Sequence, residues 1–135
     1  MSIEKKIEEF KYDLELFDDE LEKYQYIIDL GKKLNSLDEK EMIDENLVQG
    51  CTSKVWLIKD KNSDELIFRA DSNAAIVKGL VYIITTIFSN EKKDDINNLD
   101  INILDRLNLT EIITPNRQSG VQGMIKKIKE YAKGN

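Results

Sequence analysis

The chain has 135 residues, of which 41% are hydrophobic and 34% are charged, enough apolar material for one folded domain with a well-solvated surface. Its 26 acidic and 20 basic residues give a net charge of −6, which argues against nucleic acid as a partner, because phosphates require concentrated lysine and arginine. Histidine is absent and there is one cysteine, which excludes Cys-His and Ser-His nucleophile pairs, the usual histidine-containing metal sites and an internal disulfide.

The N-terminus carries no pattern typical of targeting. Residues 1–10 alternate charged and apolar side chains, without the continuous apolar core of a signal peptide. The most apolar stretch, residues 74–88, is too short for a membrane span and contains Lys78. We therefore expect a cytoplasmic protein that does not bind a membrane.

An amphipathic helix is predicted from Ile3, because apolar residues recur every three or four positions, at Ile7, Phe10, Leu14 and Phe17.

A second helix is predicted after the interruption at Asp18-Asp19, with Asp19 and Glu22 at its N-terminal cap. Gly31 marks either the end of this helix or a place of close packing. The expected buried stripe consists of Leu21, Tyr24, Ile27, Ile28 and Leu34. Residues 35–46 then form a polar, mostly acidic connection, most simply a solvated loop, with a docking surface as the alternative.

A small antiparallel sheet is predicted in the middle of the chain. Val55-Trp56-Leu57-Ile58 and Leu66-Ile67-Phe68 have the composition of strands, and the polar turn between them favours a hairpin. Because two strands alone are unstable, a third is expected, which Asn46-Leu47-Val48 could provide. Trp56 is expected to pack in the core.

The second half of the chain is predicted to be helical. Residues 74–88 are apolar almost all round and indicate a buried central helix, with Asp71-Ser72-Asn73 as its cap. Residues 91–98 are expected to be a charged loop, followed by a short helix around residues 101–107. Thr114-Pro115-Asn116 is interpreted as a break, and Ser119 as the cap of a final helix.

Cys51 follows Gly50 on a predicted turn immediately before the first strand. Gly50 allows the backbone to turn, Thr52 and Ser53 could donate hydrogen bonds to the turn or to the sulfur, and Lys54 could favour the thiolate. A free cysteine is also commonly a small buried hydrophobic residue, and no histidine is present to raise the thiolate fraction. These residues alone leave a reactive and an inert thiol equally open.

The segment around Cys51, together with three other segments of the chain, resembles a known protein family. Gly50-Cys51-Thr52-Ser53-Lys54-Val55-Trp56 resembles the Gly-Cys-x-Ser-x-Val-Trp signature of the SufE family of sulfur acceptors. Leu30-Gly31-Lys32-Lys33-Leu34 is similar to the helix end that precedes this signature, and residues 68–80 are similar to the second strand and central helix. Arg117-Gln118-Ser119-Gly120-Val121 resembles the Arg-x-Asn-Gly-Leu that opens the final helix. Asn73 stands where the family usually has aspartate.

The resemblance implies an α+β fold of the SufE/IscU type, with a small antiparallel sheet of about three strands covered by helices in a single domain, residues 1–135. It implies that Cys51 accepts persulfide sulfur from a PLP-dependent cysteine desulfurase (SufS- or CsdA-like), stimulates that enzyme, and passes the sulfur to an iron–sulfur cluster scaffold (SufB-like). The cofactor belongs to the desulfurase, so neither a cofactor nor a metal is expected here. A monomer and a homodimer are equally compatible.

The expected supporting residues surround this cysteine. Gly50 and Ser53 are expected to shape the loop, with Ser53 either stabilising the turn or assisting the sulfur. Arg117 is expected to contact the partner or steady the thiolate, or else to form a surface salt bridge. Asp71 is expected to be a helix cap rather than a catalytic acid.

Other functions remain open at this stage. A non-covalent adaptor that activates a desulfurase would need no sulfur on Cys51. A cluster scaffold is disfavoured, since clusters usually need about four thiolate ligands and the chain has one cysteine. A purely structural domain is the residual alternative.

Overall fold

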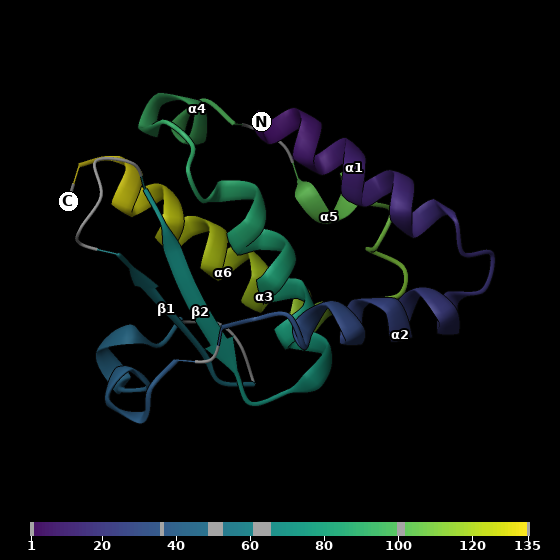
Figure 1. The fold of residues 1–135 in the computed structure, drawn as a ribbon, viewed down its shortest axis with the longest axis horizontal. Coiled ribbons are helices and arrows are strands. Elements are labelled where there is room, and N and C mark those ends of the chain that lie inside the picture. Colours follow the sequence, from purple (N-terminus) through teal and green to yellow (C-terminus); the bar gives the residue numbers. More distant parts are fainter. Residues whose placement is uncertain (1, 36, 49–52, 61–65, 100–101, 135) are drawn as a thin grey trace.

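The structure is a computed structural model that describes residues 2–35, 37–48, 53–60, 66–99 and 102–134. Helices packed around a small antiparallel sheet make it an α+β fold, as predicted (Figure 1). The described elements are α1 (Ile3–Glu15), α2 (Glu20–Gly31), the 3₁₀ turns η1 (Glu39–Glu41) and η2 (Asp44–Asn46), β1 (Val55–Lys59), β2 (Phe68–Ser72), α3 (Ala75–Phe88), α4 (Lys93–Asn97), α5 (Ile103–Arg106) and α6 (Pro115–Ala132).

The apolar helix α3 lies at the centre, in contact with α1, α2, α6 and β2. Its closest neighbour is α2, and two glycines allow this approach. A Cβ on Gly79 would lie 1.9 Å from the carbonyl oxygen of Ile27, and a Cβ on Gly31 would lie 2.8 Å from the backbone nitrogen of Gly79. Gly31 is also the last residue of α2, so both expectations for this glycine are confirmed.

Capping side chains fix the starts of the two N-terminal helices. Ser2 accepts a hydrogen bond from the Lys5 N–H, and Asp19 accepts one from the Leu21 N–H. The predicted stripe of α2 is wrong at its N-terminal end, because the side chain of Leu21 is 76% exposed.

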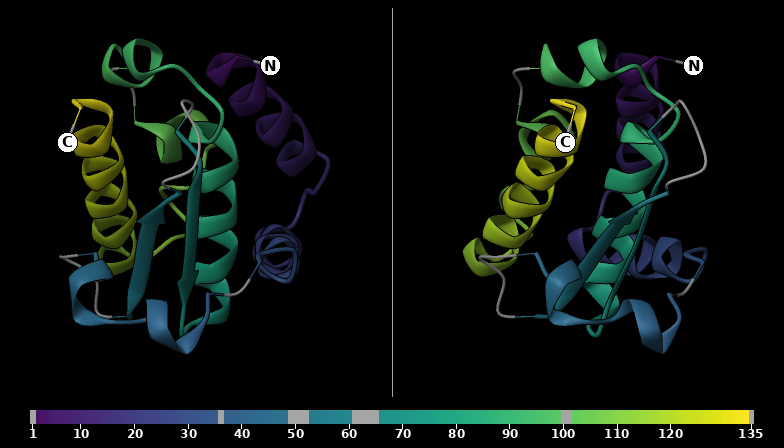
Figure 2. Two further views of the ribbon diagram at one scale, coloured as in Figure 1. Left: turned by 60° about the vertical axis from the view of Figure 1, so that its left-hand side comes forward. Right: turned by 90° about the vertical axis from the view of Figure 1, so that its left-hand side faces the viewer.

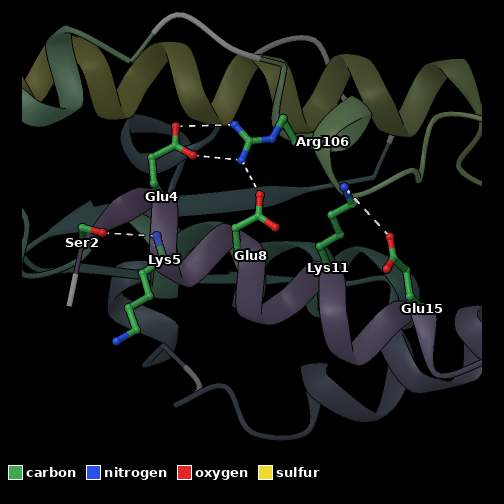
Figure 3. Close-up of polar contacts among 7 residues, drawn as sticks. All are labelled: Ser2, Glu4, Lys5, Glu8, Lys11, Glu15 and Arg106. Carbon is green, nitrogen blue, oxygen red and sulfur yellow. Dashed lines mark hydrogen bonds and ion pairs between the residues drawn. The ribbon is translucent and has the colours of Figure 1, made fainter.

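Ion pairs tie α1 to distant parts of the chain. Arg106 of α5 donates hydrogen bonds to Glu4 and Glu8, one helical turn apart on α1 (Figure 3). Lys6 reaches the C-terminal end of α3, where its ammonium donates to the Thr86 carbonyl and lies 2.6 Å from a buried carboxylate oxygen of Glu91. Cations at a helix C-terminus satisfy carbonyls that have no intrahelical partner.

Strands β1 and β2 pair antiparallel, with Leu57 opposite Ala70 and Trp56 opposite Asp71. Leu57 and Ala70 face the core, whereas Trp56 is half-buried on the other face of the sheet, so the prediction of a core tryptophan is wrong. Within the described residues the sheet has two strands, and the predicted third strand is reduced to an isolated bridge between Leu47 and Trp56.

Three element boundaries differ from the prediction. The second strand is β2, Phe68–Ser72, rather than Leu66-Ile67-Phe68, because its hydrogen-bonded pairing with β1 begins at Phe68. The expected loop at 91–98 contains the short helix α4, anchored by the buried Ile96. The final helix begins at Pro115 rather than near Ser119, since proline is well suited to the first position of a helix.

Candidate functional site

The residues that precede the cysteine are attached to the first strand of the sheet. Cys51 and Gly50 lie outside the described residues, so the site is defined by the residues that flank them. The backbone N–H of Val48 donates a 2.8 Å hydrogen bond to the carbonyl of Val55. With the bridge between Leu47 and Trp56, this bond fixes the chain before the cysteine against the first residues of β1.

A second anchor holds the chain after the cysteine. The side-chain oxygen of Asn73 accepts a 3.1 Å hydrogen bond from the Lys54 N–H, and the Ser72 hydroxyl donates a 2.8 Å hydrogen bond to the Lys54 carbonyl. Ser53, at a bend just before β1, is half-buried. The end of β2 therefore determines the position at which the cysteine-bearing connection rejoins the sheet.

Asp71 precedes the two anchoring residues and fixes the end of β2. Asp71 is buried, and its carboxylate accepts hydrogen bonds from the N–H groups of Leu37 and Ser72 and lies 3.5 Å from the ammonium of Lys78. Asp71 is the penultimate residue of β2, and α3 begins beyond Ala74 without a side-chain cap, so the predicted helix cap is wrong. A buried charge with an ion-pair partner and backbone donors is a structural device that holds the strand end in place.

Arg117 lies in the first turn of α6 and is half-buried. Its guanidinium donates a 2.6 Å hydrogen bond to the hydroxyl of Tyr24 on α2. The start of α6 is fixed by Gln118, whose amide donates to the carbonyls of Thr110 and Ile113. Both views of Figure 2 place the N-terminal ends of β1 and α6 at the same end of the molecule. The structure therefore brings Ser53 and Arg117 to one end of the fold.

A cavity of about 590 Å³ lies on the outer face of the sheet, away from this end. Arg69 and Glu41 line it and form a two-point ion pair, with nitrogen–oxygen distances of 3.0 and 2.9 Å. The hydrogen bonds from Arg69 hold the pKa of Glu41 below its usual range. Within the described residues, no three metal-ligating side chains come together. In the same part of the chain, no helix is both long and apolar enough to cross a membrane.

These features define a small α+β protein whose one cysteine lies on a connection held at both ends by the sheet. Comparison with protein families matches residues 8–132 to SufE, described as an Fe–S metabolism associated domain. The chain belongs to the SufE family. Its role is therefore in iron–sulfur metabolism, together with a cysteine desulfurase.

Individual relatives agree with this assignment. An uncharacterised SufE-like protein of Rhizobium meliloti (strain 1021) is 37% identical over 127 residues, which cover 90% of this chain and 91% of that protein. The solution structure of a hypothetical protein from Thermus thermophilus superposes with a TM-score of 0.75, covering 98% of this chain and 96% of that one. At 15% identity, the second likeness shows the fold alone.

Sequence reasoning missed the residues that attach the site. Tyr24 packs against the core as predicted, but its hydrogen bond with Arg117 is not visible in the stripe of α2. The sequence predicts Ser72 and Asn73 to be part of a helix cap, whereas they bind the backbone of Lys54 next to the cysteine-bearing connection. Asn73 stands where the family usually has aspartate, and this substitution could have indicated the anchor on Lys54. Both side chains carry an oxygen that can accept the hydrogen bond from the Lys54 N–H.

Proposed function

We propose that this protein is a sulfur carrier that accepts persulfide sulfur from a PLP-dependent cysteine desulfurase on Cys51 and delivers it to an iron–sulfur cluster scaffold. The observation that carries the proposal is the run from Gly50 to Trp56, which has the signature of the family around the only cysteine of the chain. The anchors on Val48 and Lys54 support it, because they define the ends of the connection that must present the thiol.

The transfer step needs no cofactor or oxidant on this chain. The thiolate of Cys51 attacks the outer sulfur of the persulfide on the desulfurase, so that a new S–S bond forms and the S–S bond of the desulfurase breaks. The cysteine of the desulfurase leaves as a thiolate, and the proton from the Cys51 thiol ends on that leaving group or in solvent. One persulfide is consumed and one is formed, as in thiol–disulfide exchange.

The supporting residues have positional roles in this proposal. Ser53 stabilises the bend through which the chain enters β1. Arg117, held by Tyr24, presents a cation to the desulfurase at the same end of the fold. The protein acts as a single cytoplasmic SufE-like domain, without a metal or cofactor of its own.

Intact-mass analysis tests the proposal directly. The purified chain is mixed with desulfurase and free cysteine, and the carrier function predicts a mass increase of one or more sulfur atoms that a reductant removes. Cys51→Ser abolishes the increase, and Cys51→Ser with Ser53→Cys, which moves the thiol by two positions, restores little of it. If Cys51→Ser still stimulates sulfur release fully, the protein is a non-covalent adaptor and the carrier proposal fails.

A further inference from the structure

The helical hairpin formed by α1 and α2 ends in an exposed apolar surface. Tyr12 is 67% exposed, Leu16 is 65% exposed and Leu21 is 76% exposed. Tyr12 and Leu16 are one turn apart near the end of α1, and Leu21 lies in the first turn of α2. Figure 1 shows the end of α1 joined to the start of α2 by a short connection, which is the tip of the hairpin. We call these three residues the tip surface. Among the described residues, the one other exposed large hydrophobic side chain is Ile43. Large apolar side chains exposed on both sides of one interhelical connection are typical of an interaction surface.

Acidic residues lie between and beside the tip residues in the sequence. Residues 12–22 contain six aspartates and glutamates and no lysine or arginine, a charge equal to the net −6 of the whole chain. Two of them, Asp13 and Glu15, lie in the last turn of α1, where the helix dipole disfavours negative charge. Glu15 has only the distant partner Lys11, at 4.0 Å among the described residues (Figure 3). Asp19, Glu20 and Glu22 suit the N-terminal end of α2, where negative charge is favoured. Asp13 and Glu15 gain nothing from the α1 dipole, so these two carboxylates would favour a partner that supplies cations.

The tip surface continues toward the candidate site. Leu21 and Tyr24 are three residues apart in α2 and therefore lie on the same side of this helix. Tyr24 in turn accepts the hydrogen bond from Arg117 at the start of α6. A partner that contacts Arg117 can therefore extend along α2 to the tip without crossing the core.

We propose that the tip surface is a second docking site for the cysteine desulfurase, which takes a segment with apolar side chains flanked by lysine or arginine. This inference rests on the proposed function, since the desulfurase is its occupant. Apolar contact supplies affinity at the centre of the interface, and the acidic rim accelerates encounter and makes binding sensitive to salt.

The test measures binding to the desulfurase of the same organism by calorimetry over a series of salt concentrations. All chains carry Cys51→Ser, which removes sulfur chemistry from the measurement. One variant adds Leu16→Ser with Leu21→Ser. A second adds Glu15→Lys with Asp18→Lys, changes that suit the α1 dipole. A matched control adds Asp94→Lys with Asp95→Lys on α4, an equal change of charge away from the tip.

Each tip variant is expected to bind about tenfold more weakly, a loss of about 1.4 kcal/mol. The charge-reversed tip also flattens the dependence on salt, and the α4 control binds as the unmodified chain does. Circular dichroism checks that all variants are folded.

Unchanged affinity in both tip variants overturns the docking proposal. The proposal is also overturned if the unmodified chain self-associates through the tip and the tip variants still bind the desulfurase normally. The occupant of the tip is then a second copy of the chain. The carrier proposal is judged separately, by the sulfur mass on chains with Cys51 intact. If sulfur is taken up but the tip variants bind with unchanged affinity, only the docking proposal is rejected. If binding depends on the tip but no sulfur is taken up, only the carrier proposal is rejected.

Discussion

Replacing Gly79 by alanine tests how closely α2 and α3 must approach. The added Cβ would lie 1.9 Å from the carbonyl oxygen of Ile27 and 2.6 Å from its carbonyl carbon, whereas real Cβ atoms stay beyond 3.0 Å. Both opposing atoms belong to the backbone of α2, so no side-chain rotation relieves the overlap. The two helices must move apart at their crossing, and packing around Ile27, which is fully buried, must loosen.

Two opposing effects set the magnitude. Overpacking a close contact costs about 1–3 kcal/mol, and a backbone obstacle places this site at the upper end. Alanine in a helix interior is favoured over glycine by about 0.5–1 kcal/mol. Gly79→Ala should therefore lower the free energy of unfolding by about 2 kcal/mol.

Urea unfolding monitored by circular dichroism measures this difference. Gly31→Ala provides a comparison with a smaller overlap, because its Cβ would lie 2.8 Å from the nearest atoms. It should lower the free energy of unfolding by less than Gly79→Ala does. The sign is decisive, since helix propensity alone predicts that Gly79→Ala stabilises the protein. A variant as stable as the wild type, or more so, would refute the close-packing argument.

Three further substitutions test other contacts. Lys6→Met should destabilise the fold by about 3–5 kcal/mol in urea unfolding, because it leaves the buried carboxylate of Glu91 without its cation, and adding Glu91→Gln should recover part of the loss. Glu41 has a lowered pKa when folded, so its ion pair stabilises the fold above the unfolded pKa and this contribution is lost as pH falls through the folded pKa. Urea midpoints of Glu41→Gln and wild type should therefore differ at neutral pH and converge in acid, and a difference independent of pH would contradict this reasoning. Asn73→Ala removes the acceptor for the Lys54 N–H and should slow sulfur uptake in the mass assay while costing about 1 kcal/mol of stability, whereas Asn73→Asp keeps the acceptor and the rate.

Periodicity predicted the elements whose burial is decided locally. The stripe of Ile7 and Leu14 and the continuous apolar run of α3 predicted helices that the structure contains. Errors arose where tertiary contacts override the local pattern. Leu21 continues the apolar spacing of α2, yet the helix extends beyond the core at this point and leaves the side chain in solvent. The neighbours of Asp71 are typical of a helix cap, but the residue lies in β2, where it is buried and binds the N–H of Leu37, 34 residues away.

The site could be predicted only in part for the same reason. The motif around Cys51 is local and visible in the sequence, and this made the family resemblance possible. The bonds that fix its surroundings join residues far apart in the chain, such as Arg117 with Tyr24. Single-sequence patterns carry no information about such pairs.

The two anchors of the cysteine-bearing connection limit how far the sulfur can travel. Three peptide units separate Cys51 from Val48 on one side and from Lys54 on the other, and three residues of fully extended chain span at most about 10 Å. A carrier with a long swinging arm can visit two partners in turn without moving its body. Under the proposed carrier function, this protein has to undock from the donor and diffuse to the recipient, so the lifetime of each protein complex sets an upper limit on the rate at which sulfur is relayed.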